Sequence, residues 1–148
     1  MILISHRGNI NGPNPKEENK PSYIAAAISK GYDVEVDFWF EDGRFILGHD
    51  EPQYEIPIDF MESFYRKLWI HCKNTAALSK LVEIDRIGAY LNYFWHEDDK
   101  VVLTSQGYMW TNPGTYIEAS IAVLPEIKKD KLDDRLGVCS DYIINYEH

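Results

Sequence analysis

Residues 33–50 read DVEVDFWFEDGRFILGHD, and this stretch decides the class of fold. Its first half, Asp33–Phe40, alternates in polarity and is rich in valine and aromatic residues, which predicts a β-strand. The dipeptide Asp42-Gly43 then stands between two apolar runs, which is a strong hairpin signal. We therefore expect Phe45–Leu47 to return as a second strand beside the first.

The residues before this stretch complete a β-α-β unit. Ile2–Ser5 is a short apolar run of the kind that forms a buried strand. Ser22–Lys30 is rich in alanine and is followed by Gly31, a residue that favours helix termination, so it predicts a helix. Two strands joined through a helix imply parallel pairing with a right-handed crossover. The chain therefore starts as an α/β fold.

The rest of the chain is interpreted as further strands with few helices between them. Helices are expected at Asp59–Lys67 and Thr75–Ile84, and strands at Leu68–Lys73, Gly88–Trp95, Val101–Thr104, Tyr108–Trp110, Ile121–Leu124 and Asp141–Tyr146. The connections between the later strands are too short for helices of ordinary length. These strands can stay parallel only if reduced loops take the place of the helices.

Length, composition and charge limit the class of protein. The chain has 148 residues, of which 45% are hydrophobic and 14% aromatic, so it suits one folded domain over residues 1–148. No apolar run approaches the ~20 residues that cross a bilayer. The formal net charge of −9 repels nucleic-acid backbones and anionic membranes. We therefore expect neither a nucleic-acid partner nor a stable membrane anchor.

The cysteines and the N-terminal residues indicate a cytoplasmic protein. Cys72 and Cys139 cannot form a disulfide framework and lack the spacing of a metal knuckle. Both lie in or beside apolar stretches, so buried thiols are expected. The first residues lack the basic region and the long apolar core of a signal peptide. Together these features predict reduced thiols and a cytoplasmic location.

Two histidines follow predicted strands, where barrel enzymes place their catalytic groups. His6-Arg7-Gly8 comes directly after the first strand, and His49 comes after the predicted hairpin. Two histidines can supply a general acid and a general base near neutral pH. Taken singly, each is more simply interpreted as a polar residue at the end of a strand. His96 and His148 have no comparable neighbours in the sequence, so both are expected on the surface.

Glu35 and Asp37 form a more informative pair. Positions i and i+2 on a strand point to one face, so these carboxylates are expected side by side on an apolar strand. Buried charge is costly unless it is paired or bound to a metal, and hard divalent cations favour such oxygen ligands. His71 and Lys73 alternate in the same way and could reach a metal and an anion respectively. The alternative for both pairs is a polar strand face that meets water.

The order of these segments resembles one known family. His6-Arg7-Gly8, Glu18-Asn19, Glu35-Val36-Asp37, Asp42-Gly43 and His49-Asp50 follow one another over residues 6–50. This order and spacing resemble the glycerophosphodiester phosphodiesterase family, part of the phospholipase-C-like phosphodiesterase superfamily, closely over residues 2–52. Looser similarity covers Ile70-His71-Cys72-Lys73, Tyr108-Met109-Trp110-Thr111 and Gly137–Tyr146.

The resemblance implies both a fold and an activity. It implies a reduced TIM-barrel-like (β/α) barrel without several of its helices, mainly in the second half, because a full barrel needs about 250 residues. It also implies a phosphodiester hydrolase that acts on a small glycerophosphodiester-like substrate with a divalent metal, Mg²⁺ or Ca²⁺. The implied roles are catalytic for His6 and His49, phosphate-binding for Arg7 and Lys73, metal-ligating for Glu35, Asp37 and His71, and supporting for Glu18, Asn19 and Trp110.

His71 departs from the family pattern, which has a glutamate as the third metal ligand. Imidazole is a softer ligand than carboxylate and would shift the preference toward Mn²⁺ or Zn²⁺. Alternatively, the metal keeps two carboxylates and more water, which Mg²⁺ tolerates. The third option is that metal binding is weakened and activity is changed or lost.

Two other functions stay open at this point. One is a phospholipase-C-like lyase that stops at a cyclic phosphate, and the other is a catalytically lapsed barrel that binds a phosphorylated ligand. Retention of two histidines, two carboxylates, Arg7 and Lys73 argues against the lapsed barrel, because a binder needs no acid–base pair. A barrel with few helices also leaves apolar outer strand faces uncovered, so we expect a homo-oligomer.

Overall fold

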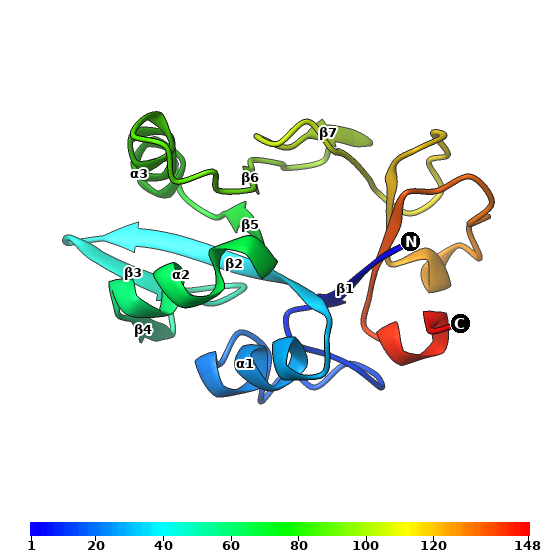
Figure 1. The fold of residues 1–148 in the computed structure, drawn as a ribbon, viewed down its shortest axis with the longest axis horizontal. Helices are drawn as coiled ribbons and strands as arrows, with labels where there is room; N and C mark the ends of the chain where they lie inside the picture. The colour runs from blue at the N-terminus through cyan, green and yellow to red at the C-terminus, as the bar shows by residue number, and fades with distance from the viewer.

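The apolar runs of the chain join into one sheet of ten strands in a mixed α/β fold (Figure 1). The computed structural model describes residues 1–148. The strands are β1 (Ile2–His6), β2 (Asp33–Glu41), β3 (Arg44–Leu47), β4 (Tyr54–Ile56), β5 (Leu68–Cys72), β6 (Tyr93–Phe94), β7 (Val101–Leu103), β8 (Met109–Thr111), β9 (Ile121–Val123) and β10 (Gly137–Ser140). The helices are α1 (Pro21–Ser29), α2 (Ile58–Phe64) and α3 (Thr75–Arg86), with short 3₁₀ helices η1 (Tyr65–Lys67), η2 (Pro125–Ile127) and η3 (Ile143–Tyr146).

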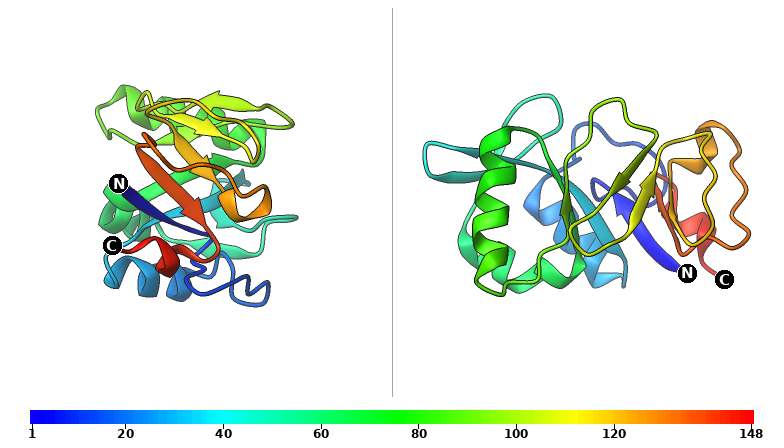
Figure 2. Two further views of the ribbon diagram at one scale, coloured as in Figure 1. Left: turned by 90° about the vertical axis from the view of Figure 1, so that its right-hand side faces the viewer. Right: turned by 90° about the horizontal axis from the view of Figure 1, so that it is seen from above.

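Parallel pairing runs through most of the sheet. β1 pairs with β2 on one side and with β10 on the other, and parallel pairs continue through β5 to β6 and through β9 to β8. The sheet curls, as Figures 1 and 2 show from three sides. The turn between β7 and β8 reaches β6, where the Ser105 backbone N–H donates to the Tyr93 carbonyl oxygen at 2.8 Å. β1 and β10, the first and last strands of the chain, lie side by side in the middle of the curl.

The predicted hairpin is confirmed. β2 pairs with β3 in antiparallel register, with Trp39 opposite Ile46 and Glu41 opposite Arg44. Asp42 and Gly43 form the turn with φ angles of 49° and 72°, which is the left-handed conformation that this dipeptide favours. β4, which the sequence did not indicate, extends the hairpin by pairing with β3.

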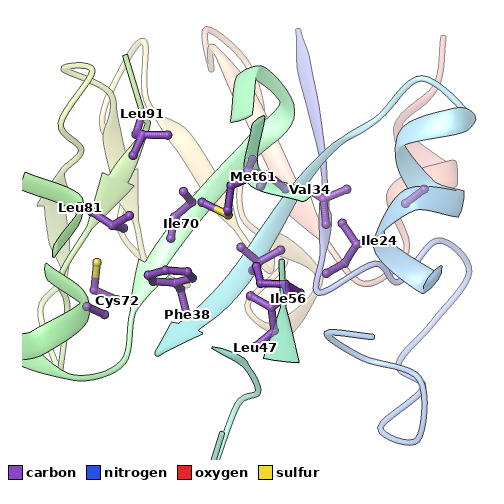
Figure 3. Close-up of a cluster of buried hydrophobic side chains, with 14 residues drawn as sticks. Ile24, Val34, Phe38, Leu47, Ile56, Met61, Ile70, Cys72, Leu81 and Leu91 are labelled. Carbon is purple, nitrogen blue, oxygen red and sulfur yellow. The ribbon is translucent and has the colours of Figure 1, made fainter. Parts of the chain in front are cut away.

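The outer face of the sheet packs against the three α-helices. Val34, Val36 and Phe38 alternate along β2 and are fully buried there, together with Ile70 of β5 (Figure 3). Ile24 of α1, Met61 of α2 and Leu81 of α3 complete this cluster from the helix side. Truncation of a buried aromatic residue such as Phe38 to alanine typically costs about 3–5 kcal/mol of stability. This layer fixes β2, which carries Glu35 and Asp37 on its other face, and β5, which carries His71 there.

A second apolar cluster fills the inside of the curl. Trp69, Phe94 and Trp110 are buried there, with ring centroids 4.7 Å apart for Phe94 and Trp110 and 5.7 Å apart for Trp69 and Trp110. Ile4 and Cys139 join them from β1 and β10. The period of two along each strand therefore separates helix-facing residues from residues inside the curl.

Loops replace helices in the second half, as the sequence predicted. Residues 112–120 connect β8 to β9, and the buried Arg135 anchors them to the sheet. Its guanidinium donates to the Thr111 hydroxyl at 2.9 Å and to the Thr115 carbonyl at 2.8 Å, and lies 4.7 Å from the Tyr116 ring centroid. None of the helices, the longest of which is α3 with 12 residues, has the length and apolar character needed to cross a membrane.

The predicted last strand, Asp141–Tyr146, is wrong. The strand is Gly137–Ser140, and residues 143–146 form η3 instead. Gly137 is needed at this position because a Cβ there would lie 2.8 Å from the Ile2 carbonyl oxygen. Ile143 then turns outward from the sheet and is buried against Val138 and Tyr32.

Two other predicted elements have different bounds. Only Tyr93–Phe94 of the expected strand Gly88–Trp95 pairs with the sheet. Gly88 (φ 91°) and Tyr90 (φ 53°) have left-handed backbone, which is incompatible with an extended strand before Tyr93. The expected helix Asp59–Lys67 is divided into α2 and η1. The expectation of buried thiols is confirmed, and burial raises the pKa of Cys72 to about 12.

Replacement of Arg135 by methionine tests whether this side chain holds the loops onto the sheet. Arg135→Met removes donors from buried oxygens, so we expect a loss of about 1–3 kcal/mol in the free energy of unfolding. Arg66→Met is the matched control, because Arg66 is exposed and bonds only to the Tyr65 hydroxyl. Urea denaturation measures both. Equal midpoints for the two variants would contradict this account of Arg135.

Candidate active site

Polar side chains gather where strands β1, β2, β5 and β10 end inside the curl. The register places His6 of β1 beside Glu35 of β2, and Asp37 of β2 beside His71 of β5. Parallel strands end at the same edge of a sheet, and alternate residues share one face, so the side chains converge. Asp141 follows directly after β10 and reaches the same place. The sequence had predicted all of these positions except Asp141.

His6 is held by the carboxylate of Asp141. Its Nδ1 lies 2.7 Å from Asp141 Oδ1 and donates to it, while Nε2 lies 3.8 Å from Glu35 Oε2. Burial lowers the pKa of His6, but the hydrogen bond to Asp141 and the charge of Glu35 outweigh it and raise the pKa overall. The same bond holds the pKa of Asp141 below its usual range despite burial. The result is an oriented imidazole with Nε2 directed toward Glu35 and the cleft.

Most partners of the fully buried Asp37 carboxylate lie close to one of its two oxygens, Oδ2. Arg7 Nε lies 3.0 Å from Oδ2, and the Asn19 amide donates to the same oxygen at 2.9 Å. The Asn19 side-chain oxygen in turn accepts the backbone N–H of Asp37 at 3.0 Å. His49 Nδ1 lies 3.5 Å from Oδ2. Burial raises the pKa of Asp37, but the His49 and His71 imidazoles and the Arg7 guanidinium outweigh it and hold the pKa well below its usual range.

Glu35, Asp37 and His71 form a set of ligand atoms that fits a cation. One oxygen or nitrogen of each lies within 4.8 Å of the others. Burial and the charge of Asp37 raise the pKa of Glu35, so the two carboxylates destabilise each other without a cation between them. Glu35 Oε2 and Asp37 Oδ1 are buried and have no hydrogen-bond partner. A divalent metal would satisfy both oxygens, so the residues present fit the group that the sequence predicted.

His49 projects from a tight loop after β3. A Cβ at Gly48 would lie 2.0 Å from the Glu51 carbonyl oxygen, so only glycine fits there. The Trp39 indole N–H donates to the Gly48 carbonyl at 2.6 Å and fixes the peptide before His49. Arg7 Nη2 lies 3.4 Å from His49 Nε2.

Glu18 and Asn9 support the site from the long loop after β1. Glu18 Oε2 lies 3.4 Å from Arg7 Nη1, and the buried Asn9 amide donates to Glu18 Oε1 at 2.9 Å. The same Asn9 amide donates to Asp141 Oδ1 at 2.8 Å. Asn9 therefore connects the group around Arg7 with the partner of His6, and neither Asn9 nor Asp141 was among the predicted site residues.

These groups surround a cleft of about 150 Å³. Its lining includes the two histidines with predicted catalytic roles, His6 and His49. Arg7, Glu35 and His71 also line it, and Phe94 and Trp110 form its apolar wall. Lys73 is outside the lining and lies 4.0 Å from Asp37 Oδ1. A second hollow of about 330 Å³ shares Arg7 and His49 with the cleft and has no apolar lining residue.

The structure brings every predicted site residue to one end of the sheet. His96 corrects the sequence interpretation, which placed it on the surface. Its ring stacks on His71 with centroids 4.7 Å apart, and it lines the cleft. No sequence signal identified it, because it follows the short strand β6 in a stretch without a recognisable motif. His148, also assigned to the surface, is exposed.

No family model matches this chain, and neither a curated protein nor a solved structure matches it.

Asp141→Asn tests whether the carboxylate raises the pKa of His6. The variant keeps the size of the side chain and removes its charge, so we expect the pKa of His6 to fall. Less of His6 is then protonated at any pH near that value. Proton NMR titration of metal-free protein measures this, with His6→Ala to assign the resonance. An unchanged pKa in Asp141→Asn would show that another group sets the protonation of His6.

Proposed function

We propose that this protein is a metal-dependent phosphodiesterase that hydrolyses a small glycerophosphodiester-like substrate. The observation that carries the proposal is the lining of one cleft by His6, His49, Arg7 and two members of the Glu35–Asp37–His71 set. Acid–base groups, an anion-binding cation and a metal-binding set are the components that cleavage of a phosphodiester requires.

The order of the strands supports a reduced TIM-barrel-like fold as the frame of this enzyme. Strands β1, β2, β5 and β6 follow in chain order along one side of the curl, and β8, β9 and β10 return in chain order along the other. The candidate site lies at the carboxyl ends of these strands, as it does in barrel enzymes. We infer a barrel whose helices after β6 are reduced to loops.

Arg7 and Lys73 are the groups that would bind the phosphate. Both are half-buried cations at the edge of the site, and the Arg7 guanidinium also contacts Glu18 and His49. Guanidinium binds phosphate oxygens through paired, charge-assisted hydrogen bonds. Charge develops on these oxygens as the diester is cleaved, so cations fixed in advance lower the barrier.

Glu35, Asp37 and His71 would hold the metal. When bound, a divalent metal polarises a phosphate oxygen and helps to orient the attacking group. The two carboxylates supply charge, and the imidazole supplies a neutral nitrogen.

His6 and His49 would move the protons. The raised pKa of His6 and its bond to Asp141 favour it as the acid that protonates the leaving oxygen. His49, which is more exposed and lies at the junction of the cleft and the second hollow, would take the proton of the attacking hydroxyl. The second hollow is lined only by polar and charged residues and proline, which suits a glycerol-like alcohol.

Alanine variants of the two histidines test the proposal. With bis(p-nitrophenyl) phosphate and glycerophosphodiesters as substrates, His6→Ala and His49→Ala should each lose about 10²–10⁴-fold in kcat, because each removes a proton-transfer group. His148→Ala, an exposed histidine, is the matched control and should keep full activity. Each enzyme is assayed with Mg²⁺, Ca²⁺, Mn²⁺ and Zn²⁺.

Activity that survives in both His6→Ala and His49→Ala would reject the assignment. Chromatography of the products separates hydrolysis from a lyase reaction, since a lyase releases a cyclic phosphate and stops there. If the cyclic phosphate accumulates, the protein is a lyase and not a hydrolase, and the roles of His6 and His49 stay the same.

A further inference from the structure

The His71 ring has its two nitrogens in different surroundings. Nε2 lies 3.3 Å from the backbone carbonyl oxygen of His96, and Nδ1 lies 3.2 Å from Asp37 Oδ1 and 4.0 Å from Glu35 Oε1. A carbonyl oxygen only accepts hydrogen bonds, so Nε2 carries the proton. In the neutral ring, Nδ1 therefore presents a lone pair to the two carboxylates.

The Nδ1 contact with Asp37 is close but is not a hydrogen bond. Asp37 Oδ1 has no hydrogen-bond partner, although it is buried and only 3.2 Å from the ring nitrogen. Arg7, Asn19 and His49 all approach the other oxygen, Oδ2. Lys73 Nζ lies 4.0 Å from Oδ1, which is beyond hydrogen-bond distance. A lone pair and an unpartnered carboxylate oxygen that face each other need a cation between them.

Stacking holds the His71 ring in this orientation. The His96 ring lies 4.7 Å away at an interplanar angle of 20°, and the Phe94 ring lies 5.3 Å away at 6°. The stacked neighbours fix the plane of the ring, and the bond from Nε2 to the His96 carbonyl selects the orientation in which Nδ1 faces the carboxylates. Histidines that bind metals donate their other N–H to a carbonyl or carboxylate in the same way.

We propose that His71, oriented by the His96 carbonyl, makes this a Zn²⁺-selective site rather than a site for Mg²⁺ or Ca²⁺. This inference rests on the metal-binding role given to the same cluster under the proposed function. Magnesium and calcium favour oxygen ligands alone, whereas zinc binds imidazole nitrogen together with carboxylate oxygen. Glu35, Asp37 and His71 would supply three ligands, two carboxylates and one imidazole, which is the number of protein ligands in catalytic zinc sites.

Calorimetric titration of metal-free protein tests the selectivity. Wild type should bind Zn²⁺ at least about tenfold more tightly than Mg²⁺ or Ca²⁺, because an imidazole ligand suits zinc and not these two cations. His71→Glu should lose at least about tenfold in Zn²⁺ affinity and gain affinity for Ca²⁺, because it restores an all-oxygen site. His71→Gln, which leaves no imidazole, should lose Zn²⁺ affinity without gaining Ca²⁺, and it serves as the second variant if His71→Glu does not fold.

Two control variants test whether the preference for Zn²⁺ comes from the His71 Nδ1 atom and not from another imidazole. His96→Ala keeps the backbone carbonyl and removes only the stacked ring, so it should retain the preference for Zn²⁺ over Mg²⁺. His148→Ala removes an exposed imidazole, and its Zn²⁺ affinity should equal that of the wild type. A Zn²⁺ affinity that falls in His148→Ala and stays unchanged in His71→Glu would overturn the proposal.

Nitrogen NMR of ¹⁵N-histidine-labelled protein reports on the ring directly. The resonance of His71, assigned with His71→Gln, should show the proton on Nε2, and Nδ1 should shift on addition of Zn²⁺. An Nδ1 resonance that does not move at saturating Zn²⁺ would overturn the proposal, as would Mg²⁺ or Ca²⁺ binding as tight as Zn²⁺ binding. None of these measurements uses turnover. Zinc binding through His71 without diester cleavage would therefore reject the proposed function alone.

Discussion

The buried negative charge of Asp37 is the constraint on which this end of the molecule depends. The carboxylate is fully buried on a strand whose other face packs against the helices, so it cannot turn toward water. A charge in that position is tolerated only when cations and hydrogen-bond donors surround it. The chain supplies Arg7 from the end of β1, Asn19 from the following loop and His49 from the hairpin. Residues from three separate segments are thereby held around one carboxylate oxygen.

The need to neutralise the buried Asp37 charge also places groups that the proposed reaction uses. Two of the partners of Asp37 Oδ2 also have proposed chemical roles, Arg7 in binding phosphate and His49 in moving a proton, and the unpartnered Oδ1 faces His71. Glu35 adds a second buried carboxylate, whose pKa is raised by burial and by Asp37. The site thus has opposing charges in close contact around two buried carboxylates, and charges interact more strongly where they are shielded from solvent.

Local sequence patterns predicted the first half of the fold and most of the site. The alternation in Asp33–Phe40 and the turn at Asp42-Gly43 are short-range signals, and the spacing of Glu35 and Asp37 follows from the period of a strand. Asp141 and Asn9 could not be found this way, because their roles depend on β10 pairing with β1 from the far end of the chain. The last strand was misplaced for a related reason, since contact with Ile2 selects Gly137 for the sheet. The position of His96 depends on β6, which has only two paired residues.

The central proposal is that His6 and His49 cleave phosphodiesters together with a metal held by Glu35, Asp37 and His71. Phosphorus NMR of a glycerophosphodiester incubated with metal-free protein, before and after addition of a divalent metal, tests it most directly. The account predicts an unchanged diester resonance without metal and its conversion to a phosphomonoester once Zn²⁺, Mn²⁺, Mg²⁺ or Ca²⁺ is added. A diester that stays intact with every metal would contradict it, and so would equal conversion in the presence of a strong chelator.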